Sequence, residues 1–156
     1  MKNIYKLIIS IIIVQFAGII GSIFTISSVS SWYLTITKPV LNPPSWIFGP
    51  VWITLYFMIG VSLFLVWKIK KRGDDKKKAL RIFSYQLILN SLWSISFFGL
   101  QNPGLGLINI LVLWLSIVWT MKLFYKVNKT AMYLLIPYLA WVSFATYLNY
   151  SIWILN

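Results

Sequence analysis

The chain has 156 residues, of which 60% are apolar and only 10% are charged, whereas soluble domains contain about 45–50% apolar and about 25% charged residues. It has no cysteine and no histidine, and its only acidic residues are Asp74 and Asp75. These features exclude a water-soluble surface, thiol chemistry, and metal or haem sites that need histidine or cysteine. The net charge of +12 sits at the ends of apolar segments, which favours membrane-surface phosphates over nucleic acid as the partner.

Five segments are long and apolar enough to cross a bilayer, which takes about 20 apolar residues in a helix. They cover residues 7–26, 47–67, 82–100, 105–121 and 131–155. Their apolar residues run continuously and do not alternate, which favours helices over the strands of a barrel. The sequence therefore predicts an all-α membrane protein in which residues 1–156 form one domain, a bundle of five transmembrane helices.

The first segment, 7–26, also has features of a secretory signal peptide, because two lysines precede it and small serines follow it. Its apolar run is longer than the roughly 7–15 residues of a signal peptide. Small residues suited to close helix packing also recur on one face; they are Ala17, Gly18, Gly21 and Ser22. We therefore expect this segment to remain as a transmembrane helix.

The loop at 27–46 is long for so compact a chain, and long loops are frequently lids. Its prolines, Pro39, Pro43 and Pro44, stiffen it. Trp32 and Trp46 give it apolar character. The sequence therefore predicts a lid over one end of the bundle.

Aromatic and amide side chains recur at helical spacing in three of the segments. These residues are Phe48, Trp52 and Tyr56 in the second segment, Gln86, Asn90, Trp93 and Phe97 in the third, and Trp141, Ala145 and Leu148 in the fifth. An unpaired amide in hydrocarbon costs roughly 2–7 kcal/mol, so we expect the two amides to face the interior. This pattern is compatible with an internal pocket for a flat, apolar ligand, and equally with simple interhelical packing.

With five spans, all but one of the 14 lysines and arginines fall on one side of the membrane. These are Lys2, Lys6, Lys68, Lys70, Lys71, Arg72, Lys76, Lys77, Lys78, Arg81, Lys122, Lys126 and Lys129, while Lys38 is alone on the other side. Such asymmetry predicts a cytoplasmic N-terminus and an external C-terminus. The basic hairpin at 68–81 is interpreted as an orientation signal that contacts anionic headgroups, in preference to a specific lipid site.

No segment carries a charged residue in its central part. Ion-coupled pumps and transporters generally use such a residue as a relay, and conventional acid–base catalysis would be left with tyrosine alone. An ordinary hydrolase, dehydrogenase or proton-coupled pump is therefore not expected.

Three blocks of the sequence together form a recognisable pattern. The first contains Trp32-Tyr33, Lys38-Pro39, Pro43-Pro44-Ser45-Trp46 and Gly49-Pro50-Val51-Trp52; the second contains Gln86, Asn90, Trp93 and Phe97-Phe98-Gly99; the third contains Pro137-Tyr138-Leu139-Ala140-Trp141, Phe144-Ala145-Thr146, Asn149 and Trp153. In this order the sequence resembles the translocator protein family, also called the tryptophan-rich sensory protein or peripheral benzodiazepine receptor family (TspO/MBR).

The resemblance implies a five-helix bundle, commonly a homodimer, with a pocket beneath the first loop. It implies binding of porphyrins and of isoquinoline carboxamide and benzodiazepine ligands, and for some bacterial members a light-dependent breakdown of porphyrin. No cofactor is required, and porphyrin is the ligand or substrate. By position, the implied pocket residues are Ser22, Tyr33, Pro43, Trp46, Ile47, Trp52, Gln86, Asn90, Trp93, Trp141, Phe144 and Ala145, with Trp52 and Trp141 as the photochemical residues.

The sequence departs from animal members of that family, which sit in the mitochondrial outer membrane and bind cholesterol. Animal members have Trp at the positions of Leu41 and Leu105 and Asp at the position of Asn109. Their sterol motif has Arg where this chain has Ile154. These differences indicate a bacterial member in the cytoplasmic membrane and make cholesterol a doubtful ligand.

Three functions follow from these observations. The first is a membrane receptor or sensor for tetrapyrroles that also promotes their light-dependent degradation. The second is a transporter of porphyrin or another apolar metabolite, which the missing intramembrane charges disfavour only in its ion-coupled form. The third is a scaffold that acts through protein partners.

Overall fold

The computed structural model describes residues 1–70 and 73–156, and these residues form helices and no strands. In chain order the elements are α1 (Asn3–Val29), α2 (Trp32–Thr35), a 3-10 turn η1 (Ser45–Ile47), α3 (Phe48–Trp67), α4 (Asp74–Ser94), a π-helical turn η2 (Ile95–Gly99), α5 (Pro103–Val127), α6 (Lys129–Tyr133) and α7 (Ile136–Leu155). Two residues of the predicted basic hairpin, Lys71 and Arg72, lie outside the described residues.

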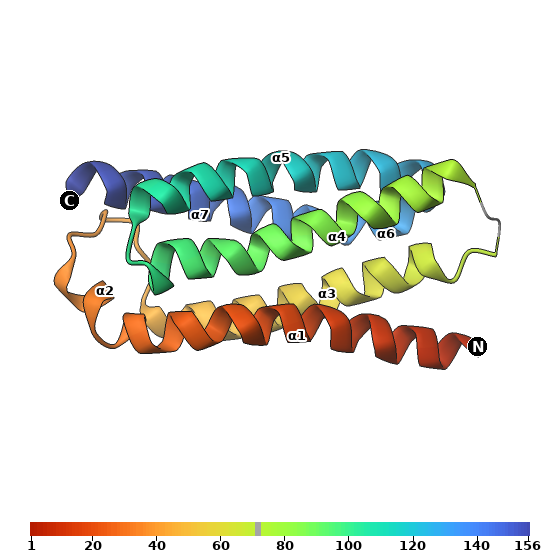
Figure 1. Ribbon diagram of the computed structural model, residues 1–156, viewed down its shortest axis with the longest axis horizontal. Helices are drawn as coiled ribbons and strands as arrows, with labels where there is room; N and C mark the ends of the chain where they lie inside the picture. Colours follow the sequence, from red (N-terminus) through yellow and green to blue (C-terminus); the bar gives the residue numbers. More distant parts are fainter. Residues whose placement is uncertain (71–72) are drawn as a thin grey trace.

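The long helices α1, α3, α4, α5 and α7 lie side by side along the length of the molecule (Figure 1). The N-terminus, the end of α3, the start of α4, and α6 lie at one end, which we call the basic end because most of the lysine and arginine residues of the chain belong to these segments. The C-terminus, α2 and the connection from α4 to α5 lie at the opposite end, which we call the loop end.

Four helical segments in the described part of the chain are long and apolar enough to cross a membrane: Asn3–Val29, Ser45–Trp67, Pro103–Val127 and Lys129–Leu155. Helix α4 is not among them because its first turns carry Asp74, Asp75 and several basic residues. The predicted span at 82–100 corresponds to the apolar remainder of α4 together with η2. The chain is thus an all-helical membrane protein in which the third segment is the most polar.

Local sequence signals explain where several helices begin. Asn102 caps α5 by accepting a hydrogen bond from the Leu105 backbone N–H at 3.0 Å, and Pro103 occupies the first turn, where no N–H is needed. Asn128 caps α6 in the same way, through the Ala131 N–H at 2.9 Å. Asp74 and Asp75 lie in the first turn of α4, where the helix dipole favours acidic side chains.

The element boundaries differ from the expected ones in three places. Helix α1 extends beyond 7–26 at both ends, and α5 extends beyond 105–121. The expected segment 131–155 is interrupted between α6 and α7, because Pro137 has no N–H to continue the helical bonding. Between η2 and α5, Gln101 has a positive φ of 52°, and Pro103 and Gly104 already belong to α5.

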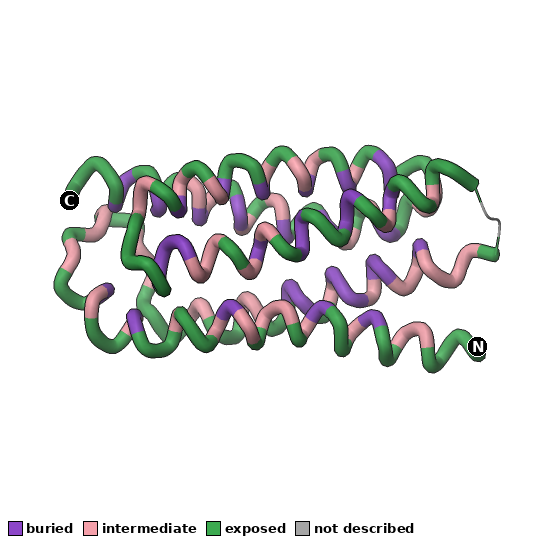
Figure 2. The backbone as a smooth tube through the Cα atoms, in the orientation of Figure 1, coloured by how far each residue is buried: buried purple, intermediate pink, exposed green. Residues whose placement is uncertain are grey.

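In α3 the buried residues lie toward the basic end (Figure 2), and many large apolar side chains along the bundle are exposed. The Phe83 and Phe124 rings stack there with their centroids 5.6 Å apart. A Cβ atom on Gly60 would lie 2.9 Å from the Ile11 Cα atom, so glycine is what permits α1 and α3 to approach closely at this level. A smaller cluster of Tyr33, Phe97, Phe98 and Ile152 occupies the loop end.

Candidate ligand-binding cavity

A cavity of about 540 Å³ lies within the loop-end half of the bundle. Its wall is formed by α1, α2, α3, α4 with η2, and α7, whereas α5 contributes none of the lining residues that the structure describes. The lining residues are Gln15, Gly18, Ile19, Ser22, Thr25, Ile26, Val29, Ser30, Tyr33, Ser45, Phe48, Gly49, Trp52, Ile53, Tyr56, Trp93, Ser94, Phe97, Phe98, Trp141, Ala145, Leu148, Asn149 and Ile152. None of these described lining residues is charged.

Three tryptophans from three helices define the aromatic wall. Trp52 stacks on the Tyr56 ring at a centroid distance of 5.3 Å. Trp93 stacks on the Phe97 ring at 5.6 Å, and Trp141 contacts the Phe48 ring edge-to-face at 6.1 Å. Such a wall presents ring faces and edges to a flat apolar ligand.

The polar atoms of these tryptophans differ in their partners. The Trp93 indole N–H donates to the Asn149 side-chain oxygen at 3.0 Å, and Asn149 in turn donates to the Pro103 carbonyl at 2.7 Å. Within residues 1–70 and 73–156, the indole N–H groups of Trp52 and Trp141 have no hydrogen-bond partner. Two hydrogen-bond donors on the wall are therefore free for a ligand.

The two predicted amides lie in a buried network between α3, α4 and α7. The Tyr56 hydroxyl donates to the Asn90 side-chain oxygen at 2.6 Å, and Asn90 donates to the Tyr138 hydroxyl at 2.9 Å. Tyr138 then donates to the Gln86 side-chain oxygen at 2.9 Å. Only Tyr56 belongs to the cavity wall, so the network lies behind the wall and closes the cavity toward the basic end.

Gln86 and Asn90 face the interior, as the sequence predicts, with exposed fractions of 1% and 2%. They do not contribute to the cavity wall. Their helical spacing with Trp93 correctly indicates one face of α4. Each helical turn, however, places the next residue on that face further along the bundle axis, so residues of one face need not reach the same cavity. The tyrosines of α3 and α7 satisfy the amides at a deeper level, except that the Gln86 side-chain nitrogen has no partner among the described residues.

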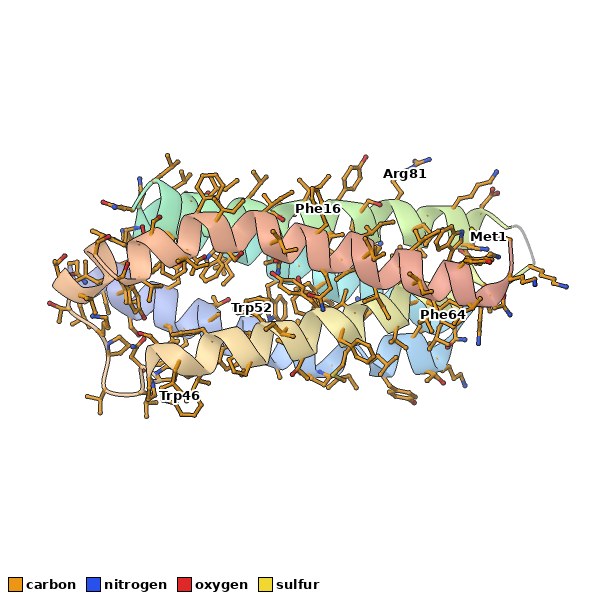
Figure 3. The ribbon with its side chains drawn as sticks, turned by 90° about the horizontal axis from the view of Figure 1, so that it is seen from below. Met1, Phe16, Trp46, Trp52, Phe64 and Arg81 are labelled. Carbon is orange, nitrogen blue, oxygen red and sulfur yellow. The ribbon has the colours of Figure 1, made fainter. Side chains whose placement is uncertain are left out.

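The structure brings six of the twelve expected site residues to the wall: Ser22, Tyr33, Trp52, Trp93, Trp141 and Ala145. The other six, all within the described ranges, lie away from it: Pro43, Trp46, Ile47, Gln86, Asn90 and Phe144. Trp46 is 73% exposed, and Figure 3 shows its side chain directed outward, whereas Trp52 points into the bundle. Phe144 lies beside the Trp141 ring at a centroid distance of 5.7 Å.

Helix α1 supplies more of the wall than the sequence indicated. Gln15, Gly18 and Thr25 line the cavity in addition to Ser22. A Cβ atom on Gly18 would collide with the Tyr56 ring. The sequence feature that marks this part of α1 is the small-residue face at 17–22. Such a face indicates close helix packing and does not by itself predict a cavity wall.

The loop after α2 is held by polar contacts and by Ile36, which packs against the cluster of Tyr33, Phe97, Phe98 and Ile152. We call residues 36–44 the strap. The Tyr33 hydroxyl donates to the Asn42 side-chain oxygen at 2.7 Å, and the Lys38 ammonium lies 4.8 Å from the Tyr33 ring centroid. Burial raises the pKa of the Tyr33 phenol, and its hydrogen bond to Asn42 offsets part of that rise. Because Tyr33 also lines the cavity, the strap is connected directly to the wall.

A second contact joins the strap to the end of α7. The Thr37 backbone N–H donates to the Asn156 side-chain oxygen at 2.9 Å, and the Asn156 side-chain nitrogen donates to the Thr37 carbonyl at 2.9 Å. The same nitrogen donates to the Ile152 carbonyl at 2.8 Å. One side chain thus ties the strap to the last turn of the bundle.

Known proteins resemble this chain over nearly its whole length. The sequence model of the TspO/MBR family matches residues 10–154. The tryptophan-rich protein TspO of Archaeoglobus fulgidus is 46% identical over 154 residues, with 99% of each chain covered, and that of Chlorobaculum tepidum is 44% identical over 155 residues, with 99% and 98% covered. The human translocator protein is 39% identical over 137 residues, covering 86% of this chain and 80% of its own.

Proposed function

The chain belongs to the TspO/MBR family, and on this basis we propose that it is a membrane receptor that binds a porphyrin-type tetrapyrrole in its cavity. The observation that carries the proposal is an uncharged cavity of about 540 Å³ whose wall combines Trp52, Trp93 and Trp141. Its volume falls within the range of about 300–1,000 Å³ typical of small-molecule sites. Flat ligands of the isoquinoline carboxamide and benzodiazepine types have the same requirements for ring stacking and a few polar contacts.

The proposal places the protein in the membrane as five spans. The apolar end of α4 continues into η2, whose Phe97 and Phe98 are buried, and we assign this segment as the third span. An odd number of spans agrees with the termini at opposite ends of the bundle (Figure 1). The cations at the basic end then favour a cytoplasmic N-terminus by the positive-inside rule, in a bacterial cytoplasmic membrane. The homodimer remains part of the proposal on the ground of the family resemblance.

Binding is favoured over transport by what lies beyond the cavity. The buried network of Tyr56, Asn90, Tyr138 and Gln86 separates it from the basic end. Behind that network the interior is filled by side chains such as Phe83 and Phe124, which are 2% and 0% exposed. A transporter would have to open this packed half during every cycle, whereas a receptor needs only the half that is already hollow.

The second part of the proposal is light-dependent degradation of the bound porphyrin. Apart from Tyr33 and Tyr56, the described lining residues include no acid or base, so light and the pigment supply the reactivity in this proposal. The excited porphyrin takes an electron from a neighbouring indole and passes it to dioxygen, which becomes superoxide. The indole radical cation then recovers an electron from the macrocycle, and superoxide adds to the porphyrin radical cation that remains, so the net reaction is addition of dioxygen to the porphyrin. Trp52 and Trp141 are the proposed donors because both line the cavity. No further cofactor is required, and cholesterol is not proposed as a ligand.

The test is titration of the purified protein with protoporphyrin IX, followed by tryptophan fluorescence quenching in the dark and by porphyrin absorbance under constant illumination. Saturable quenching with faster bleaching than in empty detergent micelles supports both parts. Saturable quenching without faster bleaching leaves a receptor only. Uptake into sealed proteoliposomes without saturable quenching would instead favour the transporter.

A further inference from the structure

The cavity is open toward one side of the bundle. Six of its described lining residues are exposed, and all six belong to α1, α3 or the turns that adjoin them: Ile19, Ile26, Ser30, Ser45, Gly49 and Ile53. The lining residues of α4, η2 and α7 are buried or half-buried. In Figure 3 the Trp52 side chain is seen between the α1 and α3 ribbons. A residue that borders a cavity and is also exposed lies at an opening, so the cavity opens between α1 and α3.

The opening is closed toward the basic end, where α1 and α3 approach each other. A Cβ atom on Gly18 would collide with the Tyr56 ring. The Gln15 side-chain nitrogen donates a long hydrogen bond to the Ile53 carbonyl at 3.5 Å. Toward the loop end, by contrast, a Cβ atom on Gly49 would meet nothing within 4 Å. The two helices therefore meet below the cavity and separate beside it.

The opening has the depth of one leaflet of the bilayer. Both helices that border it belong to segments that are long and apolar enough to cross a membrane. Along α1 the lining runs from Gln15 to Val29, which is about 21 Å at a rise of about 1.5 Å per residue. One leaflet contributes about 15 Å to a hydrocarbon core of about 30 Å. Most of the opening therefore faces lipid acyl chains and not water.

The rim and the α1 wall present apolar surface to those chains. Ile19, Ile26 and Ile53 of the rim are 56%, 70% and 63% exposed. The Ser22 and Thr25 hydroxyls donate to backbone carbonyls of α1 itself, at 2.8 Å and 3.1 Å, so they offer little to water. A buried water molecule needs about two to four polar partners, whereas an empty space loses dispersion contacts. Fluid hydrocarbon beside the opening can supply those contacts.

We propose that an acyl chain of a phospholipid, from the leaflet at the loop end, enters between α1 and α3 and occupies the cavity while no other ligand is bound. A flexible chain fits this opening better than a second copy of the protein does. A helix with its side chains is about 10–12 Å wide, so it can cover the rim but cannot follow the opening to its closed end at Gly18 and Tyr56. The inference does not depend on porphyrin binding, and it implies that any cavity ligand competes with lipid.

The first experiment maps lipid contacts in the unmodified, ligand-free protein. The vesicles consist of dioleoylphosphatidylcholine with a minor amount of phosphatidylcholine that carries a diazirine near the end of one acyl chain. After illumination, mass spectrometry should locate adducts on the inner wall at Ala145 and Leu148, which are only 7% and 6% exposed. Phe83 and Phe124 are the internal controls, because they are equally buried but lie outside the cavity lining, and they should carry none.

Two results of this experiment would overturn the proposal. Adducts confined to outward-facing side chains, such as Ile23 and Phe57, would show that acyl chains touch the bundle without entering it. Protection of both the rim and the inner wall would show that a second copy covers the opening.

The second experiment obstructs the opening with a larger side chain. Ile26 and Ile23 both lie on α1 and are 70% and 63% exposed, but only Ile26 lines the cavity. Ile26→Trp should therefore lower the yield of adducts at Ala145 and Leu148 severalfold, whereas Ile23→Trp should match the unmodified protein. Thermal unfolding verifies that both variants are folded. Equal inner-wall yields in the two folded variants would contradict entry between α1 and α3.

A third measurement separates this inference from the proposed function. Protoporphyrin IX is added to the same vesicles, and we expect adducts at Ala145 and Leu148 to decrease in step with tryptophan quenching, while adducts at Ile23 stay constant. Inner-wall adducts that persist without any saturable quenching would refute the porphyrin receptor and support the acyl chain. Saturable quenching in a protein whose inner wall never forms adducts would support the receptor and refute the acyl chain.

Discussion

The Tyr56 hydroxyl on α3 donates to the Asn90 side-chain oxygen on α4 at 2.6 Å, and this bond marks the level at which the cavity ends and the packed core begins. Tyr56 presents one side to the cavity, while Asn90 continues the network to Tyr138 on α7. Three helices are thus joined across the interior at one level. This arrangement forms a rigid boundary of the cavity on the side of the basic end.

Replacement of Asn90 by Leu should lower stability more than ligand affinity. It removes both bonds of Asn90, each worth about 0.6 kcal/mol on average between membrane helices, and leaves the buried Tyr56 hydroxyl without its acceptor. We expect a loss of about 1–2 kcal/mol, measured by thermal unfolding in detergent. Gln86→Leu is the control, because among the described residues the Gln86 side chain makes one bond and its nitrogen has no partner. A large fall in porphyrin affinity with unchanged stability would instead show direct ligand contact.

Two glycines of the cavity wall form a matched pair. A Cβ atom on Gly18 would collide with the Tyr56 ring, whereas a Cβ atom on Gly49 would meet nothing within 4 Å. Gly18→Ala should therefore displace Tyr56, with a cost of about 1–3 kcal/mol from overpacking and weaker porphyrin binding. Gly49→Ala should leave fluorescence titration and thermal unfolding nearly unchanged. Similar behaviour of the two variants would contradict the described approach of α1 to α3.

Replacement of Trp52 or Trp141 by phenylalanine should separate porphyrin binding from photochemistry. It keeps most of the ring stacking, which is worth about 0.5–1.5 kcal/mol, and removes the easily oxidised indole. We expect protoporphyrin affinity within about threefold of the unmodified protein, a difference of less than 1 kcal/mol, with most of the light-driven bleaching lost. The measurements are dark fluorescence titration and absorbance loss under constant light. Bleaching that falls only in proportion to the bound fraction would assign both tryptophans to packing.

Orientation in the membrane can be tested at two exposed positions. Val40→Cys lies on the strap at the loop end, and Gly73→Cys lies beside the start of α4 at the basic end. On intact cells an impermeant thiol reagent should label Val40→Cys and leave Gly73→Cys unlabelled until the membrane is permeabilised, because positively charged segments stay in the cytoplasm. The reverse pattern would invert the proposed topology.

The sequence predicts the helical segments because continuous apolar runs have few other structures open to them in a bilayer. Helical spacing also places Gln86 and Asn90 inside the bundle, but it does not tell which level along the axis they occupy. That level is determined by Tyr56 and Tyr138, which come from helices far away in the sequence. Periodicity carries no information about such partners.

The sequence also does not predict which loop side chains are buried, for a different reason. Tyr33 and Trp46 both lie in the expected lid, yet Tyr33 is 3% exposed and Trp46 is 73% exposed. A loop has no regular repeat from which a side chain's direction can be read. The contact between Thr37 and Asn156 spans 119 positions of the chain, and an asparagine after the last apolar run gives no sign of such a bond.

The π-helical turn η2 has a consequence for how the chain tolerates changes in length. Leu100 N–H bonds to the Ile95 carbonyl five residues earlier, at 2.7 Å, so this turn holds one residue more than an α-helical turn. The extra residue lets three consecutive side chains, Ser96, Phe97 and Phe98, all be buried. Deletion of one residue here would remove the extra residue and restore a regular α-helical turn, while the residues on either side keep their faces. A single-codon deletion in η2 should therefore be tolerated better than one in the regular part of α4, where the following residues would rotate by about 100°.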